Sequence, residues 1–203
     1  MVCVHGLWMT GLEMTLLRHR LRACGFEVWQ FRYPSVRRAP AENAARLARF
    51  VAGLQADIVH FVAHSLGGIV VLHLLARQAD LPPGRVVMLG TPLRGSRVAR
   101  RAAAIPPLRW LLGRSLEQGL LGDHPPWPAG RELAMIAGTS GRGFGRLLLP
   151  SLPKPHDGTV AVDETDAPCV RQHLQVPTSH FGMLFSAPVA ARVCRYLRSG
   201  ELG

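Results

Sequence analysis

The sequence contains almost no lysine, few aromatic residues and no long apolar run. Lys154 stands alone among the 24 lysine and arginine residues, which give the 203-residue chain a net charge of +11. Aromatic residues make up only 6%, and the arginines are scattered, so the stacking surface of a nucleic-acid-binding protein is missing. A peripheral contact with an anionic surface stays open. No apolar stretch reaches the roughly 18 residues of a membrane-spanning helix.

Nucleotide-binding, metal-binding and targeting signals are absent as well. The sequence has no GxGxxG or GxxxxGK[ST] pattern and no CxxC pair. Its cysteines, Cys3, Cys24, Cys169 and Cys194, lie among apolar neighbours, and we expect them to be buried thiols. The N-terminus resembles a strand and not a secretion leader, which indicates a cytoplasmic location, or a secreted one if a leader has been removed.

Strand and helix patterns alternate along a chain that is 48% hydrophobic. Strands are predicted at 2–5, 26–33, 58–63, 85–89, 133–137 and 170–176. Helices are predicted at 10–23, 41–54, 66–78 and 188–198. The alternation predicts a single α/β domain over residues 1–203, whose mostly parallel sheet is flanked by helices on both faces. An irregular insertion is expected around residues 95–130, where prolines interrupt the pattern.

The stretch "FVAHSLGGIV" at 61–70 places Ser65 between a predicted strand and a predicted helix. Ala63 and Gly67, two residues to either side, are small, as the tight turn of a nucleophile elbow requires. The following helix N-terminus offers free N–H groups and positive potential to a developing oxyanion. A serine that only caps the helix is the alternative interpretation.

The "AHSLGG" motif, with "VHGLW" upstream, resembles the α/β-hydrolase superfamily. Within it, the chain is similar to small bacterial lipases that lack a lid and carry AHSxG. The resemblance covers nearly the whole chain and is weakest between residues 95 and 128. It implies a minimal α/β-hydrolase fold in which Ser65 is the nucleophile and the backbone N–H groups of Leu7 and Leu66 hold the oxyanion. His5 is expected to shape its turn.

The catalytic base is expected near the carboxyl end of the chain, because the order in this fold is serine, acid, histidine. His180 in "PTSHFGMLFS" follows the last predicted strand, and its flanks resemble the H-x-G-x-L-x-S arrangement of the lidless lipases. His156 and His173 are expected to be structural or exposed.

The acid that orients the base is expected in "HDGTVAVDET". Asp157 matches the D-x-[IT]-V element of the resembled family, and Asp163 is the alternative. Ser96 is expected to cap a helix after the turn "LGTPLRGS", whose glycines allow close approach to the site. The leucine-rich segment 105–121 either partly covers an acyl pocket or packs against the sheet.

The predicted function is a serine hydrolase that cleaves carboxylic esters with short to medium acyl chains through an acyl-enzyme. Its substrate would be a small-molecule or lipid ester, and no cofactor or metal is required. A thioesterase or acyltransferase with the same triad is one alternative. A non-catalytic protein that binds anionic polymers through its arginines is another.

Overall fold

The computed structural model describes residues 1–78, 80–128, 130–143 and 148–203, and within these ranges six strands form one parallel sheet. Its strand order is β2-β1-β3-β4-β5-β6, and every neighbouring pair is parallel. The strands are β1 (Val2–Val4), β2 (Trp29–Phe31), β3 (Phe61–His64), β4 (Val86–Leu89), β5 (Leu133–Gly138) and β6 (Gln172–Val176). The predicted α/β architecture with a mostly parallel sheet is confirmed.

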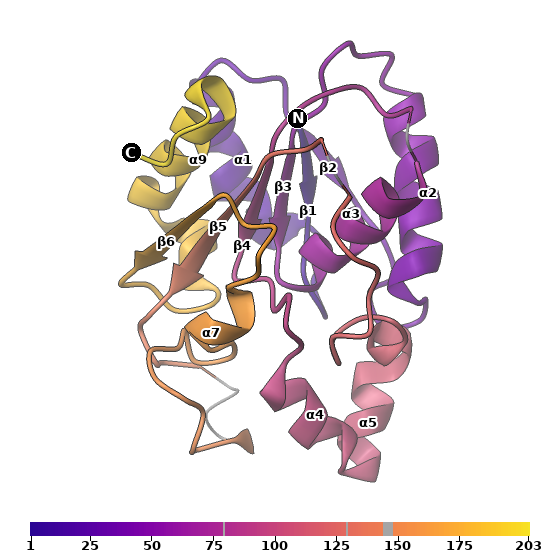
Figure 1. The fold of residues 1–203 in the computed structure, drawn as a ribbon, viewed down its shortest axis with the longest axis vertical. Helices are drawn as coiled ribbons and strands as arrows, with labels where there is room; N and C mark the ends of the chain where they lie inside the picture. Colours follow the sequence, from indigo (N-terminus) through magenta and orange to yellow (C-terminus); the bar gives the residue numbers. More distant parts are fainter. Residues whose placement is uncertain (79, 129, 144–147) are drawn as a thin grey trace.

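Helices cover both faces of this sheet (Figure 1). Helices α1 (Thr15–Ala23) and α9 (Ala187–Ser199) lie on one face, and α2 (Pro40–Ala52) and α3 (Leu66–Arg77) lie on the other. Successive residues of a strand point to opposite faces. Val62 therefore packs in the core under α1 and α9, whereas its neighbours Phe61 and Ala63 pack in the core under α2 and α3.

The segment expected to be irregular is partly helical, and this expectation is corrected. It contains α4 (Arg97–Ala103), α5 (Pro106–Leu112) and the 3-10 turn η2 (Gly113–Leu116). Prolines at the start of α5 occupy the first turn, where a backbone N–H has no partner within the helix. Ser96 caps α4 as predicted, with Oγ accepting a hydrogen bond from Ala99 N–H at 3.1 Å. Residue 129 of the predicted insertion lies outside the described residues.

Several short elements complete the fold. A 3-10 turn, η1 (Leu12–Met14), begins the segment predicted as one helix at 10–23. The helices α7 (Val162–Thr165) and α8 (Gly182–Phe185) follow β5 and β6, and neither was predicted. In the ranges that the structure describes, no helix combines the length and apolar character needed to cross a membrane.

Two of the cysteines form a disulfide, so the expectation of four thiols is wrong for that pair. Cys24 follows α1, Cys194 lies in α9, and their Cα atoms are 6.4 Å apart. The two helices pack side by side on one face of the sheet, which brings together residues 170 positions apart in sequence. Cys3 is a buried thiol and Cys169 a partly buried one.

Candidate active site

Ser65 occupies the corner between β3 and α3 with φ 53° and ψ −123°. Residues other than glycine rarely adopt a positive φ, and such a conformation persists only where surrounding contacts enforce it. Ser65 N–H donates to Leu89 O at 2.9 Å, and Ser65 O accepts from Thr91 Oγ1 at 2.9 Å and from Gly68 N–H at 3.0 Å. The corner is therefore fixed from the neighbouring strand β4 and the segment after it.

The two glycines after this corner have no room for a side chain. A Cβ on Gly67 would lie 2.4 Å from Val4 O, and one on Gly68 would lie 2.2 Å from Thr91 Oγ1. The helix can start this close to β1 and Thr91 only because both positions are glycine. The small residue expected two positions after Ser65 is thus required by the packing.

Of the predicted oxyanion donors, Leu7 lies on the loop after β1 and Leu66 is the first residue of α3. In the described part of the chain, the N–H groups of Leu7 and Leu66 donate to no protein acceptor. The fully buried His5 shapes the first loop, as expected: its ring stacks on Tyr33 at 4.2 Å, and its Nδ1 lies 2.9 Å from Gly6 O. Burial lowers the pKa of His5, which favours the neutral ring.

His180 and Asp157 meet at the carboxyl edge of the sheet. Nδ1–H of His180 donates to Asp157 Oδ2 at 2.5 Å, and the backbone N–H of His180 donates to Asp157 O at 2.9 Å. Both side chains are buried. In a neutral ring with its proton on Nδ1, Nε2 of His180 is able to accept a proton.

Backbone donors hold the Asp157 carboxylate in its charged form. Oδ1 accepts from Thr159 N–H at 2.9 Å and from Val160 N–H at 2.7 Å. Burial alone would raise the pKa of Asp157, but the adjacent His180 and these two N–H groups outweigh burial, so the pKa lies below its ordinary value.

Asp157 and His180 can lie close to the backbone at position 90 because this residue is glycine. Its φ is 60°, and a Cβ there would approach both Asp157 Oδ2 and His180 Cε1 to 3.1 Å. The close approach predicted for the glycines after β4 is confirmed at this position.

The other predicted candidates lie away from His180. Asp163, the alternative acid, pairs with Arg97 through two bonds of 2.7 and 2.8 Å. His156 Nδ1 accepts Gly158 N–H at 3.1 Å, and Thr165 Oγ1 lies 2.8 Å from His173 Nε2. Asp157 is therefore the carboxylate that contacts the predicted base.

Ser65 and His180 line one cavity. In the part of the chain that the structure describes, no hydrogen bond joins Ser65 Oγ to the His180 ring. Hydrogen bonds between catalytic groups are often long or poorly aligned until substrate binds. The Ser65 hydroxyl and the His180 imidazole thus belong to the lining of one cavity.

His64 is a neighbour of this pair that sequence reasoning did not identify. Its Nε2 lies 3.0 Å from His180 O, and the two ring centroids are 4.6 Å apart. Burial, with a smaller contribution from His180, lowers the pKa of His64 to about 3. The neutral ring then donates Nε2–H to His180 O and holds the loop that carries His180.

The cavity beside Ser65 has a volume of about 130 Å³ and is mostly apolar. Its walls include residues of α4, α5 and the segments that follow them: Val98, Ala99, Ala102, Leu112, Leu120 and Leu148. In segment 105–121, Leu112 and Leu120 line the cavity and also pack against Leu66 and Ile69 of α3. The segment therefore both contributes a cavity wall and packs against the domain core.

A metal centre has no candidate ligands in the described ranges, where no group of three or more histidine, cysteine, aspartate or glutamate side chains could hold an ion. The residues that line the cavity include Ser65 with its hydroxyl, His180 with an imidazole paired to Asp157, and Leu7 with its free backbone N–H.

Comparison with known structures finds the same fold in bacterial enzymes. The mature lipase BlEst2 of Bacillus licheniformis is 21% identical, with 95% of this chain and 90% of that chain covered and a TM-score of 0.78. The metagenomic carboxyl esterase MGS0156 is 22% identical over 88% of this chain and 63% of that one, with a TM-score of 0.69. Phospholipase PlaB of Legionella pneumophila, in complex with thio-NAD, is 16% identical over 98% and 58%, with a TM-score of 0.77.

These identities are low enough that the likeness shows the fold alone. No curated protein matches the sequence. A family model described as "Alpha/beta hydrolase family" matches residues 1–199, almost the full length. With the parallel sheet and the corner at Ser65, this match confirms the resemblance noted in the sequence: the chain belongs to the alpha/beta hydrolase family.

Proposed function

We propose that the protein is a serine hydrolase that cleaves carboxylic esters with short to medium acyl chains. The observation that carries the proposal is a serine held at a positive φ beside a cavity that is also lined by His180, whose ring is paired with the buried carboxylate of Asp157. A helix cap would need neither the strained corner nor the second pair. The lipase and esterase names of the structural neighbours agree with this assignment.

The reaction begins at Ser65. Its Oγ attacks the ester carbonyl carbon while Nε2 of His180 accepts the hydroxyl proton, and Asp157 stabilises the imidazolium that forms. The carbonyl oxygen takes up the negative charge and accepts hydrogen bonds from the N–H groups of Leu7 and Leu66. Losing one donor of this kind typically costs about 10²–10³ in rate.

Collapse of this intermediate gives an acyl-enzyme. His180 returns its proton to the leaving alcohol oxygen as the carbon–oxygen bond breaks, and the acyl group stays on Ser65 Oγ. Water then attacks the acyl carbon, with His180 as base again. The products are the acid and free Ser65.

The cavity supports the choice of substrate. Its apolar walls suit an acyl chain, and its volume of about 130 Å³ is small compared with the roughly 300–1,000 Å³ of pockets for drug-sized ligands. Short p-nitrophenyl esters such as the butyrate should therefore be hydrolysed faster than long ones such as the palmitate.

Hydrolysis of p-nitrophenyl butyrate tests the proposal. Ser65→Ala should lower kcat by about 10⁴-fold or more, because the nucleophile is lost while the cavity remains. Ser199→Ala is the matched control, since Ser199 lies at the exposed end of α9 and its Oγ donates to Arg195 O. Equal rates for the wild type and folded Ser65→Ala would overturn the proposal.

A further inference from the structure

A groove of about 850 Å³ lies beside the catalytic cavity, and large apolar side chains are exposed along it. Trp110 is 78% exposed, Trp8 61% and Leu111 46%. Trp8 Nε1–H donates to Leu111 O at 2.9 Å, which joins the loop after β1 to α5. Exposed aromatic side chains gathered at one place are unusual on a surface that faces only water.

This groove adjoins the proposed active site. Trp8 lines both the groove and the cavity that contains Ser65. Phe181, next to His180, also lines the cavity and is 51% exposed. Two exposed aromatic side chains, Trp8 and Phe181, thus lie at the cavity itself, and Trp110 and Leu111 lie in the adjoining groove.

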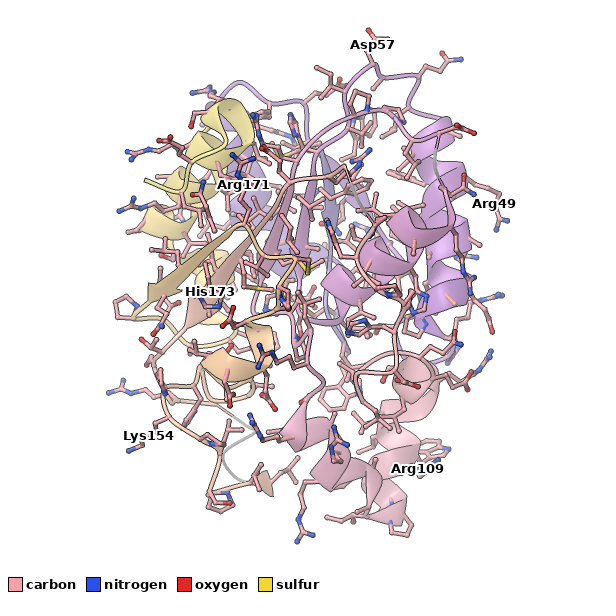
Figure 2. The ribbon with its side chains drawn as sticks, in the orientation of Figure 1. Arg49, Asp57, Arg109, Lys154, Arg171 and His173 are labelled. Atoms are coloured by element: carbon pink, nitrogen blue, oxygen red, sulfur yellow. A yellow bond between two sulfur atoms is a disulfide. The ribbon has the colours of Figure 1, made fainter. Side chains whose placement is uncertain are left out.

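Arginines accompany these apolar residues. Arg37, Arg109 and Arg114 line the groove, and all three are exposed. Arg114 pairs with Glu42 and Glu117, whereas Arg37 and Arg109 have no ion-pair partner within the described residues. Figure 2 shows Arg109 projecting from α5 at the end of the molecule beyond the strand carboxyl ends.

We propose that this surface, made by Trp8, Trp110, Leu111, Arg37 and Arg109, docks onto an anionic lipid bilayer. Tryptophan prefers the boundary between headgroups and acyl chains, and arginine is attracted to anionic headgroups. The combination of the two kinds of residue around one opening favours a lipid surface over a second copy of the chain, whose groove would carry the same unpaired positive charge.

Docking would present the cavity mouth to esters that reside in the membrane. This role rests on the proposed ester hydrolysis, whereas the docking itself does not require catalysis. The two claims are therefore tested separately, with binding measured in a variant that lacks the nucleophile.

Sedimentation with vesicles measures the docking. In a Ser65→Ala background, the protein should bind vesicles of phosphatidylcholine with about one third phosphatidylglycerol and bind pure phosphatidylcholine much more weakly. Arg109→Ala should weaken binding about fivefold, and Arg37→Ala with Arg109→Ala about 25-fold. Trp110→Ala should weaken it several-fold, and added salt should weaken the wild type.

Matched controls lie elsewhere on the surface. Arg49 is exposed on α2, away from α5 in Figure 2, and Trp29 is 43% exposed at the start of β2, at the amino end of the sheet. Arg49→Ala and Trp29→Ala should bind vesicles like the parent. With Ser65 restored, Trp110→Ala and Arg109→Ala should hydrolyse soluble p-nitrophenyl butyrate at the wild-type rate.

Three results would overturn the docking proposal. The first is that the protein binds equally to vesicles with and without phosphatidylglycerol. The second is that the control variants lose as much vesicle binding as the groove variants. The third is that the protein forms a dimer in the absence of vesicles and that Trp110→Ala dissociates this dimer. Vesicle binding without any ester hydrolysis by the wild type would support docking and reject only the proposed function.

Discussion

Asp157 and Asp163 lie six residues apart, and their surroundings give them different roles. Asp157 is buried, accepts two backbone N–H groups and contacts His180, whereas Asp163 forms an exposed pair with Arg97. Exposed ion pairs typically contribute about 0–1 kcal/mol to stability. The sequence ranks the two carboxylates only through the motif of the resembled family, whereas the structure shows that only Asp157 contacts His180.

Asparagine substitutions distinguish these carboxylates. Asp157→Asn should lower kcat for p-nitrophenyl butyrate by about 10³–10⁴-fold, because an amide cannot stabilise the charged imidazole or fix its tautomer. Asp163→Asn should change kcat less than about twofold, since only a solvent-exposed pair is lost. Similar losses in both variants would argue against Asp157 as the acid.

Local sequence could predict the residues of the elbow but not the residues that support it. Ser65 and Gly67 are recognisable because a tight strand-to-helix turn requires small residues at fixed positions on either side of the serine. The hydrogen bond of His64 to His180 O spans 116 residues, and Thr91 reaches Ser65 O from the segment that follows β4. Such contacts depend on sheet order, which local patterns do not specify.

At the scale of elements, the Cys24–Cys194 disulfide ties α1 to α9 on one face of the sheet. Neither cysteine shows a pairing signal, because only the packing of the two helices brings them together.

The prolines between residues 95 and 130 led to the expectation of an irregular segment, but two of them begin a helix. Pro106 and Pro107 lie in the first turn of α5, where the proline ring favours helix geometry. In the interior of a helix, proline would instead break it.

The disulfide should contribute to stability. A bond closing so long a loop typically stabilises a fold by about 2–5 kcal/mol. Cys24→Ser with Cys194→Ser should lower the free energy of unfolding in guanidinium by that amount. Cys169→Ser, which leaves the disulfide intact, should change it less.

Thiol counting checks the same bond directly. In denaturant without reductant, an alkylating reagent should modify Cys3 and Cys169 only. After reduction it should modify all four cysteines. Modification of all four before reduction would show that the bond is absent.

On the scale of the whole molecule, several histidines resist protonation. Burial is the largest cause, and it lowers the pKa to about 3 at His64 and about 4 at His60, and lowers it also at His5, His73 and His173. An unfolded histidine titrates near pH 6.5. Between these pKa values the unfolded chain binds more protons than the folded one.

Acid should therefore destabilise the protein well above the pKa of its carboxylates. The free energy of unfolding should fall as the pH drops from about 6.5 towards 4, by up to about 1.4 kcal/mol per pH unit for each such buried histidine. Urea unfolding at several pH values in this range measures how steeply the free energy of unfolding changes with pH. His60→Gln removes one titrating group, so it should reduce this slope by the contribution of about one proton. A free energy that stays constant over this range would contradict the account.

The overall architecture was accessible from sequence because each strand and helix carries its own periodic pattern. The edge strand β6 is polar and has no fully buried residue, and α7 and α8, with four residues each, are too short to show a helical period. The sequence left open whether segment 105–121 covers a pocket, because the answer depends on how α4 and α5 pack with Leu66 and Ile69 of α3.

Covalent labelling with a fluorophosphonate, followed by peptide mapping, most directly tests whether the corner after β3 presents an activated nucleophile. The reagent should attach to Ser65 alone, and the rate of labelling should fall sharply in His180→Ala. Attachment to another serine, or equally fast labelling in His180→Ala, would contradict the account.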